Sequence, residues 1–280
     1  LIFSNTIQDK FNSKQTAVLC ISDAHNGVEI NMQTVFNEPI NIYSPDILKK
    51  RLNKLADTVI KDYKNNFNYK KLIVFDLGDG IQNILRLSDI AKLKTGVIDS
   101  VLQYAEMISQ FLNKIQNELN IQIEFSCLGG NHSELRLIST GRNWESENLG
   151  KVIREFIALR LKDNQNIKVD PYSDFSFKQI EGINILAIHG DDSKKNINEI
   201  SYWEQYHNIT IDILLMGHFH HQEQISLGYS PTGDKEIIIV PSLIGIDEFS
   251  RKNRKLARAG AKFILFEDNN KTWEKVIYLN

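Results

Sequence analysis

Cysteine is scarce in this 280-residue chain, since Cys20 and Cys127 are the only two and each lies inside an apolar run. Two such residues indicate neither a disulfide framework nor a thiol-rich metal site, so we expect both to be small buried core residues. The net charge is also small, −2 at pH 7. A net charge this close to zero does not indicate binding to nucleic acid or to a membrane, although a local basic patch is not excluded.

Long apolar runs and targeting signals are absent as well. The longest apolar runs are far too short to span a bilayer, and residues 1–5 lack the basic start and apolar stretch of a secretory signal. The chain contains no internal repeat, low-complexity tract or evident linker. We therefore expect one domain over residues 1–280, located in the cytoplasm and without a membrane partner.

What the chain does contain is an alternation of strand and helix in its first half. Apolar runs rich in β-forming residues predict strands, and apolar residues at helical spacing predict the helices between them. Ser44-Pro45 is typical of a helix start. Residues 26–44 are polar and irregular, and we expect a long loop there. The expected strands are 16–21, 71–77 and 121–128, and the expected helices begin at 45 and cover 97–115 and 152–161.

The second half changes character after about residue 166. Short strand-like runs follow one another, separated by turn residues, and only one helix, around 196–206, is expected among them. The expected strands are 167–169, 175–180, 183–188, 211–216, 224–227, 236–240, 261–267 and 273–279. The fold class is therefore α/β, with a second half that is mostly β.

Five short polar segments follow apolar runs, and together they hold five of the seven histidines. The last of them contains two histidines at i and i+2, which on an extended segment project to the same side. The segments are Asp23-Ala24-His25, Gly78-Asp79, Gly130-Asn131-His132, His189-Gly190 and Gly217-His218-Phe219-His220.

Taken alone, Asp-x-His, Gly-Asp, Gly-Asn-His and His-Gly are each explained by an ordinary turn or a surface histidine, whereas Gly-His-x-His fits a site equally well. Jointly they indicate a metal site, because histidine is the commonest metal ligand and mixed nitrogen and oxygen sets suit manganese, iron or zinc. In open α/β sheets, ligands gather at the carboxyl ends of strands, which is where these residues lie.

The order and identity of these segments resemble the calcineurin-like metallophosphoesterase superfamily, whose pattern is Asp-x-His, Gly-Asp, Gly-Asn-His-(Asp/Glu), His and Gly-His-x-His. The resemblance covers Asp23 to His220 and implies a four-layered α/β/β/α sandwich. It implies one metal held by Asp23, His25 and His220, a second held by Asn131, His189 and His218, and Asp79 bridging both. His132 would face the phosphate and assist the leaving group, as the catalytic residue.

The chemistry implied is phosphate-ester hydrolysis by a hydroxide that bridges two divalent metal ions. Mn²⁺ is the expected metal, with iron, zinc and nickel as alternatives. Asp79 suits the shared position, because a carboxylate can give one oxygen to each metal. The family usually has Asp or Glu after Gly-Asn-His, whereas this chain has Ser133 and then Glu134. The carboxylate that would orient His132 is therefore left open.

Residues 242–249 and the region around Asn143-Trp144 resemble a phage- or prophage-borne branch, whose members are described as like the SbcD-type DNA repair exonucleases. The chain ends about sixty residues after His220, and we expect no separate capping domain. This branch implies a nuclease in a bacterial or phage-infected cell.

Several residues are candidates for contacting such a substrate. The segment 251–258 carries five positive charges in eight residues, which suits a phosphate backbone and equally an ordinary solvated turn. Tyr202, Trp203 and Tyr206 are able to stack a base, but on a helix two of the three are more often core. The candidate substrate-binding residues are Arg136, Arg142, Arg251 and Arg254.

Three functions remain open from the sequence. The first is a metal-dependent phosphodiesterase acting on nucleic acid, as an exonuclease or endonuclease. The second is a phosphomonoesterase or a phosphodiesterase for cyclic nucleotides or dinucleotides. The third is a non-catalytic scaffold, which ranks last because every ligand position is filled. A monomer and a homodimer are both open.

Overall fold

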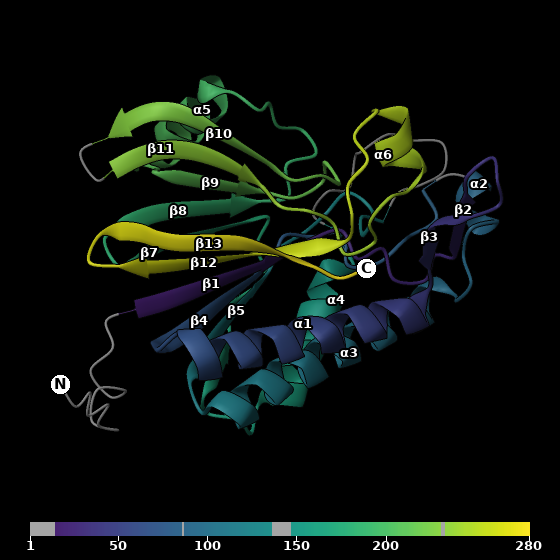
Figure 1. Cartoon of the computed structure of the whole chain (residues 1–280), viewed down its shortest axis with the longest axis horizontal. Helices are drawn as coiled ribbons and strands as arrows, with labels where there is room; N and C mark the ends of the chain where they lie inside the picture. Colours follow the sequence, from purple (N-terminus) through teal and green to yellow (C-terminus); the bar gives the residue numbers. More distant parts are fainter. Residues whose placement is uncertain (1–14, 86, 136–146, 231–232) are drawn as a thin grey trace.

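The computed structural model describes residues 15–85, 87–135, 147–230 and 233–280, and all statements about structure concern these residues. Two β-sheets pack face to face, with helices on their outer faces (Figure 1). This arrangement is the four-layered α/β/β/α sandwich, so the predicted fold class is confirmed.

The first sheet combines strands from both ends of the chain in the order β13-β12-β1-β4-β5-β6. Four of its strands run parallel, whereas β12 is antiparallel to both β1 and β13. The strands are β1 Gln15–Ile21, β4 Tyr69–Asp76, β5 Gln122–Cys127, β6 Ile167–Val169, β12 Gly260–Glu267 and β13 Asn270–Tyr278.

The second sheet comes from the β-rich second half, in the order β10-β11-β9-β8-β7. Its three central strands are parallel, and the outer strands pair antiparallel with them. The strands are β7 Phe175–Ile180, β8 Ile183–Ile188, β9 Ile213–Met216, β10 Glu223–Ser230 and β11 Gly233–Ile239.

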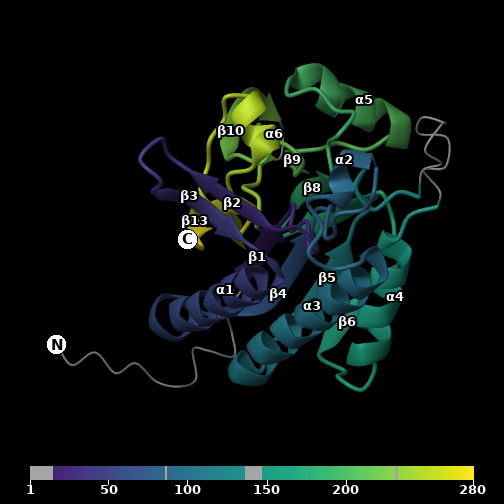
Figure 2. The same ribbon diagram turned by 90° about the vertical axis from the view of Figure 1, so that its right-hand side faces the viewer.

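Helices cover the outer face of each sheet. Three lie against the first sheet and one, α5 Ile197–His207, against the second (Figure 2). The three are α1 Pro45–Asn66, α3 Val97–Leu119 and α4 Gly150–Leu161. As predicted, α1 starts at Pro45, and the Ser44 side chain accepts a hydrogen bond from the main chain of Ile47 at 3.4 Å.

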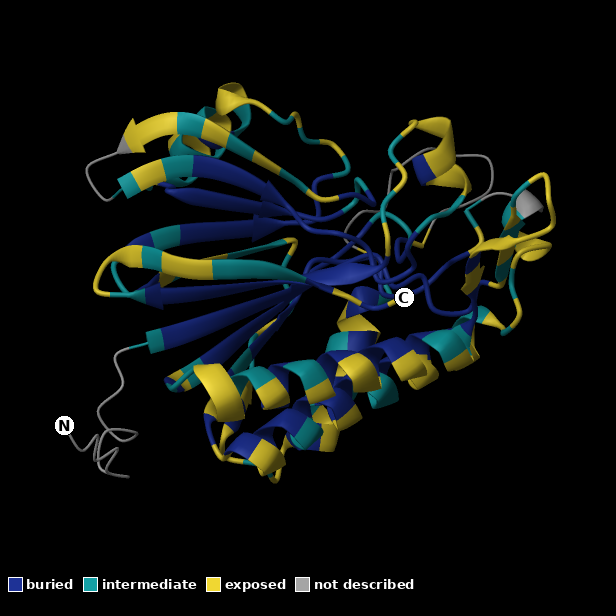
Figure 3. Cartoon of the chain, viewed as in Figure 1, coloured by how far each residue is buried: buried dark blue, intermediate teal, exposed yellow. Residues whose placement is uncertain are grey.

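The core has three layers because side chains of a strand alternate between the two faces of its sheet. In β1, Leu19 and Ile21 face the helices while Val18 and Cys20 face the second sheet. Cys127 packs on the helix side. Both cysteines are buried and unbridged, as predicted. Figure 3 shows that the inner strands are buried, whereas the edge strands β10 and β13 and the outward faces of the helices are largely exposed.

The space between the sheets is apolar at its centre and polar at two edges. At one edge, Lys178 of β7 bonds Glu124 of β5 at 2.9 Å and Asp170 at 2.7 Å. At the other, Lys271 of β13 contacts Glu236 of β11. These ion pairs are only partly exposed, and they tie each edge of one sheet to the other.

Three short elements, a hairpin and two short helices, were not predicted from the sequence, and all three lie at one end of the sandwich (Figure 1). Residues 26–44 contain a hairpin, β2 Ile30–Gln33 and β3 Pro39–Tyr43, so the prediction of an irregular loop is wrong. Its strands are short and exposed on most of their surface, which leaves little periodic signal. The others are α2 Leu87–Ile90 and α6 Glu248–Lys252.

Among the described residues, no helix is both long enough and apolar enough to cross a membrane.

Candidate metal centre

The predicted ligands come together at one end of the two sheets, just beyond the strands that carry them. Asp23 and His25 follow β1, and Asp79 follows β4. The remaining ligands follow β5, β8 and β9 and are Asn131, His189, His218 and His220. Because the inner strands of both sheets are parallel, their carboxyl ends meet at the same end of the sandwich.

The backbone at these positions is unusual. Five residues at this end lie in the left-handed region, with φ between 45° and 64°. They are Asp23, His25, Asp79, His218 and His220. Non-glycine residues adopt this conformation rarely and at an energetic cost, and such residues concentrate at functional sites. The expectation that His218 and His220 lie on an extended segment is therefore wrong, since turns rather than strand alternation direct their rings.

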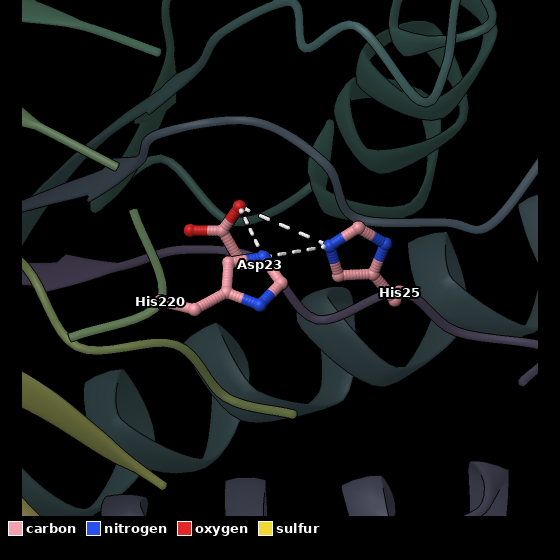
Figure 4. Close-up of side chains that lie close together, drawn as sticks. All are labelled: Asp23, His25 and His220. Atoms are coloured by element: carbon pink, nitrogen blue, oxygen red, sulfur yellow. Dashed lines mark hydrogen bonds and ion pairs between the residues drawn. The ribbon is translucent and has the colours of Figure 1, made fainter. Parts of the chain in front are cut away.

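One group of side chains is formed by Asp23, His25 and His220, all buried (Figure 4). Nε2 of His220 lies 3.2 Å from Nε2 of His25 and 3.3 Å from Oδ1 of Asp23. Nε2 of His25 lies 3.9 Å from the same carboxylate oxygen. Two imidazole nitrogens and one carboxylate oxygen thus face a common point.

A second group contains Asp79, His189 and His218. Nε2 of His189 lies 3.1 Å from Oδ2 of Asp79 and 3.1 Å from the side-chain oxygen of Asn131. The ligand atoms of Asp79, His189 and His218 lie within 4.8 Å of one another. The structure therefore brings all seven predicted ligands into two adjoining groups.

Asp79 lies between the two groups, and only one of its carboxylate oxygens faces both of them. Its Oδ2 is 4.0 Å from Nε2 of His25 and 3.1 Å from Nε2 of His189. Its Oδ1 instead accepts the main-chain N–H of His132 at 2.7 Å. The expectation that each oxygen serves one metal does not match this geometry, in which Oδ2 alone faces both groups.

The orientation of three histidine rings is set by contacts of their Nδ1 atoms. His25 Nδ1 lies 3.1 Å from Oε1 of Gln82, and His189 Nδ1 lies 2.8 Å from the carbonyl oxygen of Leu77. His220 Nδ1 lies 3.1 Å from Oδ2 of Asp247. Oxygen acceptors hold Nδ1 of His25 and His189, so these Nδ1 atoms carry a proton and Nε2 presents its lone pair inward. Nδ1 of His220 faces the Asp247 carboxylate at ion-pair distance, which favours a proton on the same nitrogen.

In this arrangement the Nε2 lone pairs of the imidazoles face carboxylate oxygens, and both are hydrogen-bond acceptors. The buried atoms Asp23 Oδ1 and Asp79 Oδ2 have no hydrogen-bond donor among the described residues, although imidazole Nε2 atoms lie close to each. Buried charge of one sign has to be compensated, either by further protons on the imidazoles or by cations. The donor set, mixed nitrogen and oxygen, fits divalent cations of the first transition row.

The pKa values of the metal-free site agree with this need for positive charge. Burial alone would lower the pKa of His189 and His220, but Asp79 beside the first and Asp23 beside the second outweigh it and raise both to about 10. Burial would raise the pKa of Asp23, yet His220 lowers it to about 2. Two imidazolium ions thus balance the carboxylates when no metal is bound.

His132 lies beside the first group, with its ring centroid 4.7 Å from that of His25. Burial lowers the pKa of His132 to about 3, against the opposing influence of Asp79. Its Nδ1 is buried and has no hydrogen-bond partner among the described residues. The Ser133 hydroxyl donates to the carbonyl of Gly130 at 3.0 Å.

The candidate substrate residues are distributed differently. Arg136 and Arg142 lie outside the described residues, as do Asn143 and Trp144. Arg251 and Arg254 are exposed at and just beyond the end of α6.

The predicted aromatic cluster lies on α5, on the outer face of the second sheet. Trp203 packs against that sheet's outer core. Tyr202 and Tyr206 are exposed and stack on one another, with ring centroids 5.9 Å apart. Only the partly buried Trp203 packs on the core, one residue fewer than the two that the alternative interpretation expected.

Sequence reasoning missed Gln82 and Asp247, the side chains that contact His25 and His220. Gln82 follows Asp79 closely enough for the motif to suggest it. Asp247 lies 27 residues after His220, and only the path of the intervening chain brings the two together.

Comparison with known proteins gives one relative in sequence and several remote similarities in structure. No protein-family profile matches the chain. The chain is 30% identical over 263 residues to the SPbeta prophage-derived uncharacterized protein YonJ of Bacillus subtilis (strain 168). That match covers 92% of this chain and 63% of the relative, so the chain spans less than two thirds of its length.

The solved structures are similar at low identity. Vps29 of Entamoeba histolytica, complexed with zinc, has a TM-score of 0.41 at 10% identity and covers 94% of this chain and 99% of its own. A metallophosphoesterase from Sphaerobacter thermophilus has a TM-score of 0.38 at 12% identity, with coverages of 94% and 89%. These similarities are remote, and they carry no argument about the activity of this chain.

The sequence motifs are complete and in order, and the structure adds that their side chains meet at one end of an α/β/β/α sandwich in two groups around Asp79. A chance set of turns would not converge in this way. This is the arrangement of side chains that the resemblance to the calcineurin-like metallophosphoesterase superfamily implies.

Proposed function

We propose that the chain is a two-metal phosphoesterase that hydrolyses phosphodiester bonds, and that its physiological substrate is nucleic acid. The observation that carries the proposal is the position of Asp79 Oδ2, which lies near both ligand groups. Each group has three further predicted ligands of its own. A single structural metal would need only one such group.

Each of the two groups would bind one cation. Asp23, His25 and His220 would hold one cation, and Asn131, His189 and His218 the other, with Asp79 in contact with both. When bound, the two cations supply the Lewis acidity that activates water at neutral pH and offsets charge on a phosphate. Because Asn131 is neutral, the site has only two ligand carboxylates and is less repulsive to an anionic ester.

His132 is the group of this chain placed to move a proton. Its ring lies beside His25 at the edge of the site, and it is neutral at pH 7 in the metal-free protein because burial lowers its pKa to about 3. An anionic phosphate next to the ring favours the imidazolium form and raises that pKa. The imidazolium can then protonate the departing oxygen, as a general acid.

Nucleic acid is favoured by the surroundings of the centre. The Phe249 ring on α6 lies 5.4 Å from the His218 ring and 5.1 Å from the His220 ring. The same short helix continues into the exposed basic residues Arg251 and Lys252. An aromatic ring and cations beside a phosphate site suit a base and a phosphate backbone.

The prophage origin of the relative YonJ is compatible with a phage-borne branch resembling SbcD-type exonucleases and acting in the bacterial cytoplasm. We propose Mn²⁺ as the metal, since nitrogen and oxygen donors are mixed in each group.

Hydrolysis of small phosphate esters is the second candidate, because two cations of the basic segment have local partners. Lys255 contacts Glu223 at 3.2 Å, and Arg258 stacks on Tyr278 with its guanidinium 3.8 Å from the ring centroid. Fewer cations then remain for a long backbone than the sequence suggests.

The experiment is hydrolysis by Mn²⁺-loaded protein, with Asp79→Ala as the blank. Single- and double-stranded DNA are compared with an aryl phosphodiester and an aryl phosphomonoester. DNA cleavage that disappears in Asp79→Ala supports the proposal. Turnover of small esters alone selects the second candidate, and no turnover of any substrate by metal-loaded protein overturns the assignment as a phosphoesterase.

A further inference from the structure

Residues 242–247 form the loop before α6. In the structure this loop is attached by its main chain to the end of β1, where the first ligands lie. The Leu243 N–H donates to the carbonyl of Ser22 at 2.8 Å, and the Ile244 N–H donates to the carbonyl of Asp23 at 3.1 Å. The loop therefore has a fixed position relative to Asp23.

A buried pair of side chains holds the loop from its other side. Arg51 of α1 donates to the carbonyls of Leu243 at 2.7 Å and Ile244 at 2.8 Å. Asn41 of β3 donates to the carbonyls of Ile244 at 2.9 Å and Ile246 at 2.7 Å. Arg51 also donates to Asn41 at 3.0 Å. Buried hydrogen bonds of a charged donor are strong, so the loop is rigidly placed.

Asp247, at the end of this rigid segment, uses its two oxygens for different purposes. Oδ1 accepts the main-chain N–H of Ser250 at 2.8 Å and caps α6, while the Asp247 N–H donates to Oγ of Ser250 at 2.9 Å. Oδ2 lies 3.1 Å from Nδ1 of His220. The side chain is only 15% exposed.

We propose that Asp247 is a positioning residue for His220, which it holds with Nε2 directed at Asp23 while it also seats α6 and Phe249 beside the centre. This inference deepens the proposed function and rests on the assignment of His220 as a metal ligand. A carboxylate on the outer nitrogen of a ligand histidine fixes the ring and increases its basicity.

If Asp247 only capped α6, its role would be an ordinary structural one. A variant of Ser250 separates capping from the contact with His220. Ser250→Ala removes the hydroxyl that accepts from the Asp247 main chain and leaves the contact between Asp247 and His220 unchanged. Asp247→Asn keeps a good cap and a neutral acceptor. Asp247→Ala removes both contacts of the side chain.

The test measures Mn²⁺ binding to the full chain by calorimetry. Thermal unfolding of each variant is measured alongside. We expect Asp247→Ala to weaken one of two Mn²⁺ sites by about 10- to 100-fold, Asp247→Asn to weaken it by less, and Ser250→Ala to bind as wild type does. Combining Asp247→Ala with His220→Ala is expected to weaken binding no further than His220→Ala alone.

Wild-type affinity at both sites in Asp247→Ala overturns the proposal, and so does an equal loss in Ser250→Ala. If Asp247→Ala fails to fold, wild-type affinity in Asp247→Asn overturns it in the same way. The measurement uses no turnover, so a protein that binds two Mn²⁺ ions and cleaves no ester contradicts the proposed function without affecting this comparison. A wild-type chain that binds no Mn²⁺ contradicts both.

Discussion

The main-chain N–H of His132 donates to Oδ1 of Asp79 at 2.7 Å, and this bond leaves Oδ2 of Asp79 as the oxygen that faces both ligand groups. The segment that carries the candidate general acid therefore also orients the shared ligand. Because the donor is a main-chain group, the two tasks can be separated by mutation.

His132→Ala retains that main-chain donor and removes only the imidazole. We expect the variant to keep both metal ions and to lose turnover by about 10²- to 10⁴-fold, the usual contribution of a general acid. Metal content and kcat are measured on the same preparation. Full activity, or loss of the metals, would show that the role assigned to His132 is wrong.

Gly130 gives the contrasting case. A Cβ at this position would lie 2.3 Å from both the main-chain nitrogen and Oδ1 of Asp79. Gly130→Ala should therefore displace Asp79, with reduced metal content and a stability loss of about 1–3 kcal/mol. Gly96→Ala is the control, because its Cβ would meet nothing nearer than 3.8 Å. Normal metal content in Gly130→Ala would contradict the close packing seen here.

Metal binding should release protons. In the metal-free protein at pH 7, His189 and His220 are both protonated, because Asp79 and Asp23 raise their pKa values to about 10 despite burial. Cations must displace these protons, so we expect release of about two protons per chain and an affinity that rises with pH. Calorimetry in Tris and in Pipes gives the number, and release near zero would contradict the charge balance described for the site.

The fold and the ligand set could be predicted because both leave local signals. Buried strands such as β1 and β4 are continuous apolar runs, and each ligand follows such a run directly. Parallel strands bring their carboxyl ends together whatever the loops do. Asp23 and Asp79 were therefore predictable neighbours from their positions alone.

The contacts around the ligands could not be predicted in this way. The pairing of Asp247 with His220 depends on Arg51 and Asn41, which hold the loop although they precede it in the chain by about 200 positions. The hairpin β2–β3 was missed because most of its side chains are exposed and carry no periodic pattern. Left-handed residues such as His218 have no signal in residue type when they are not glycine or asparagine.

Phe249 should matter for substrates that carry a ring. It is 38% exposed and lies beside both His218 and His220. We expect Phe249→Ala to lower kcat/KM for DNA and for an aryl phosphodiester by about tenfold or more, as loss of a stacking partner does, with metal content unchanged. Leu256→Ala is the control, because Leu256 is exposed in the adjoining basic segment 251–258. An equal effect in both variants would indicate a general disturbance of the segment.

Asp76 makes the stability of the metal-free protein depend on pH. Burial raises the pKa of its carboxyl from 3.8 to about 7, although the hydroxyl of Tyr104, which donates to it at 2.7 Å, acts in the opposite direction. The folded chain keeps this proton up to about pH 7, whereas the unfolded chain releases it near pH 4. The stabilising contribution of the protonated group is therefore complete below pH 4 and is lost as the pH rises to 7.

Asp76→Asn mimics the protonated form and keeps an acceptor for Tyr104. We expect the variant to be more stable than wild type at pH 8, by an amount on the order of a few kcal/mol, with a smaller difference at pH 4. Urea unfolding in EDTA at both pH values measures this, because the chelator keeps cations from altering the charge balance. Asp163→Asn, an exposed carboxylate after α4, should show no such trend. A destabilisation of Asp76→Asn that is the same at both pH values would mean that Asp76 is ionised throughout and that its burial is compensated.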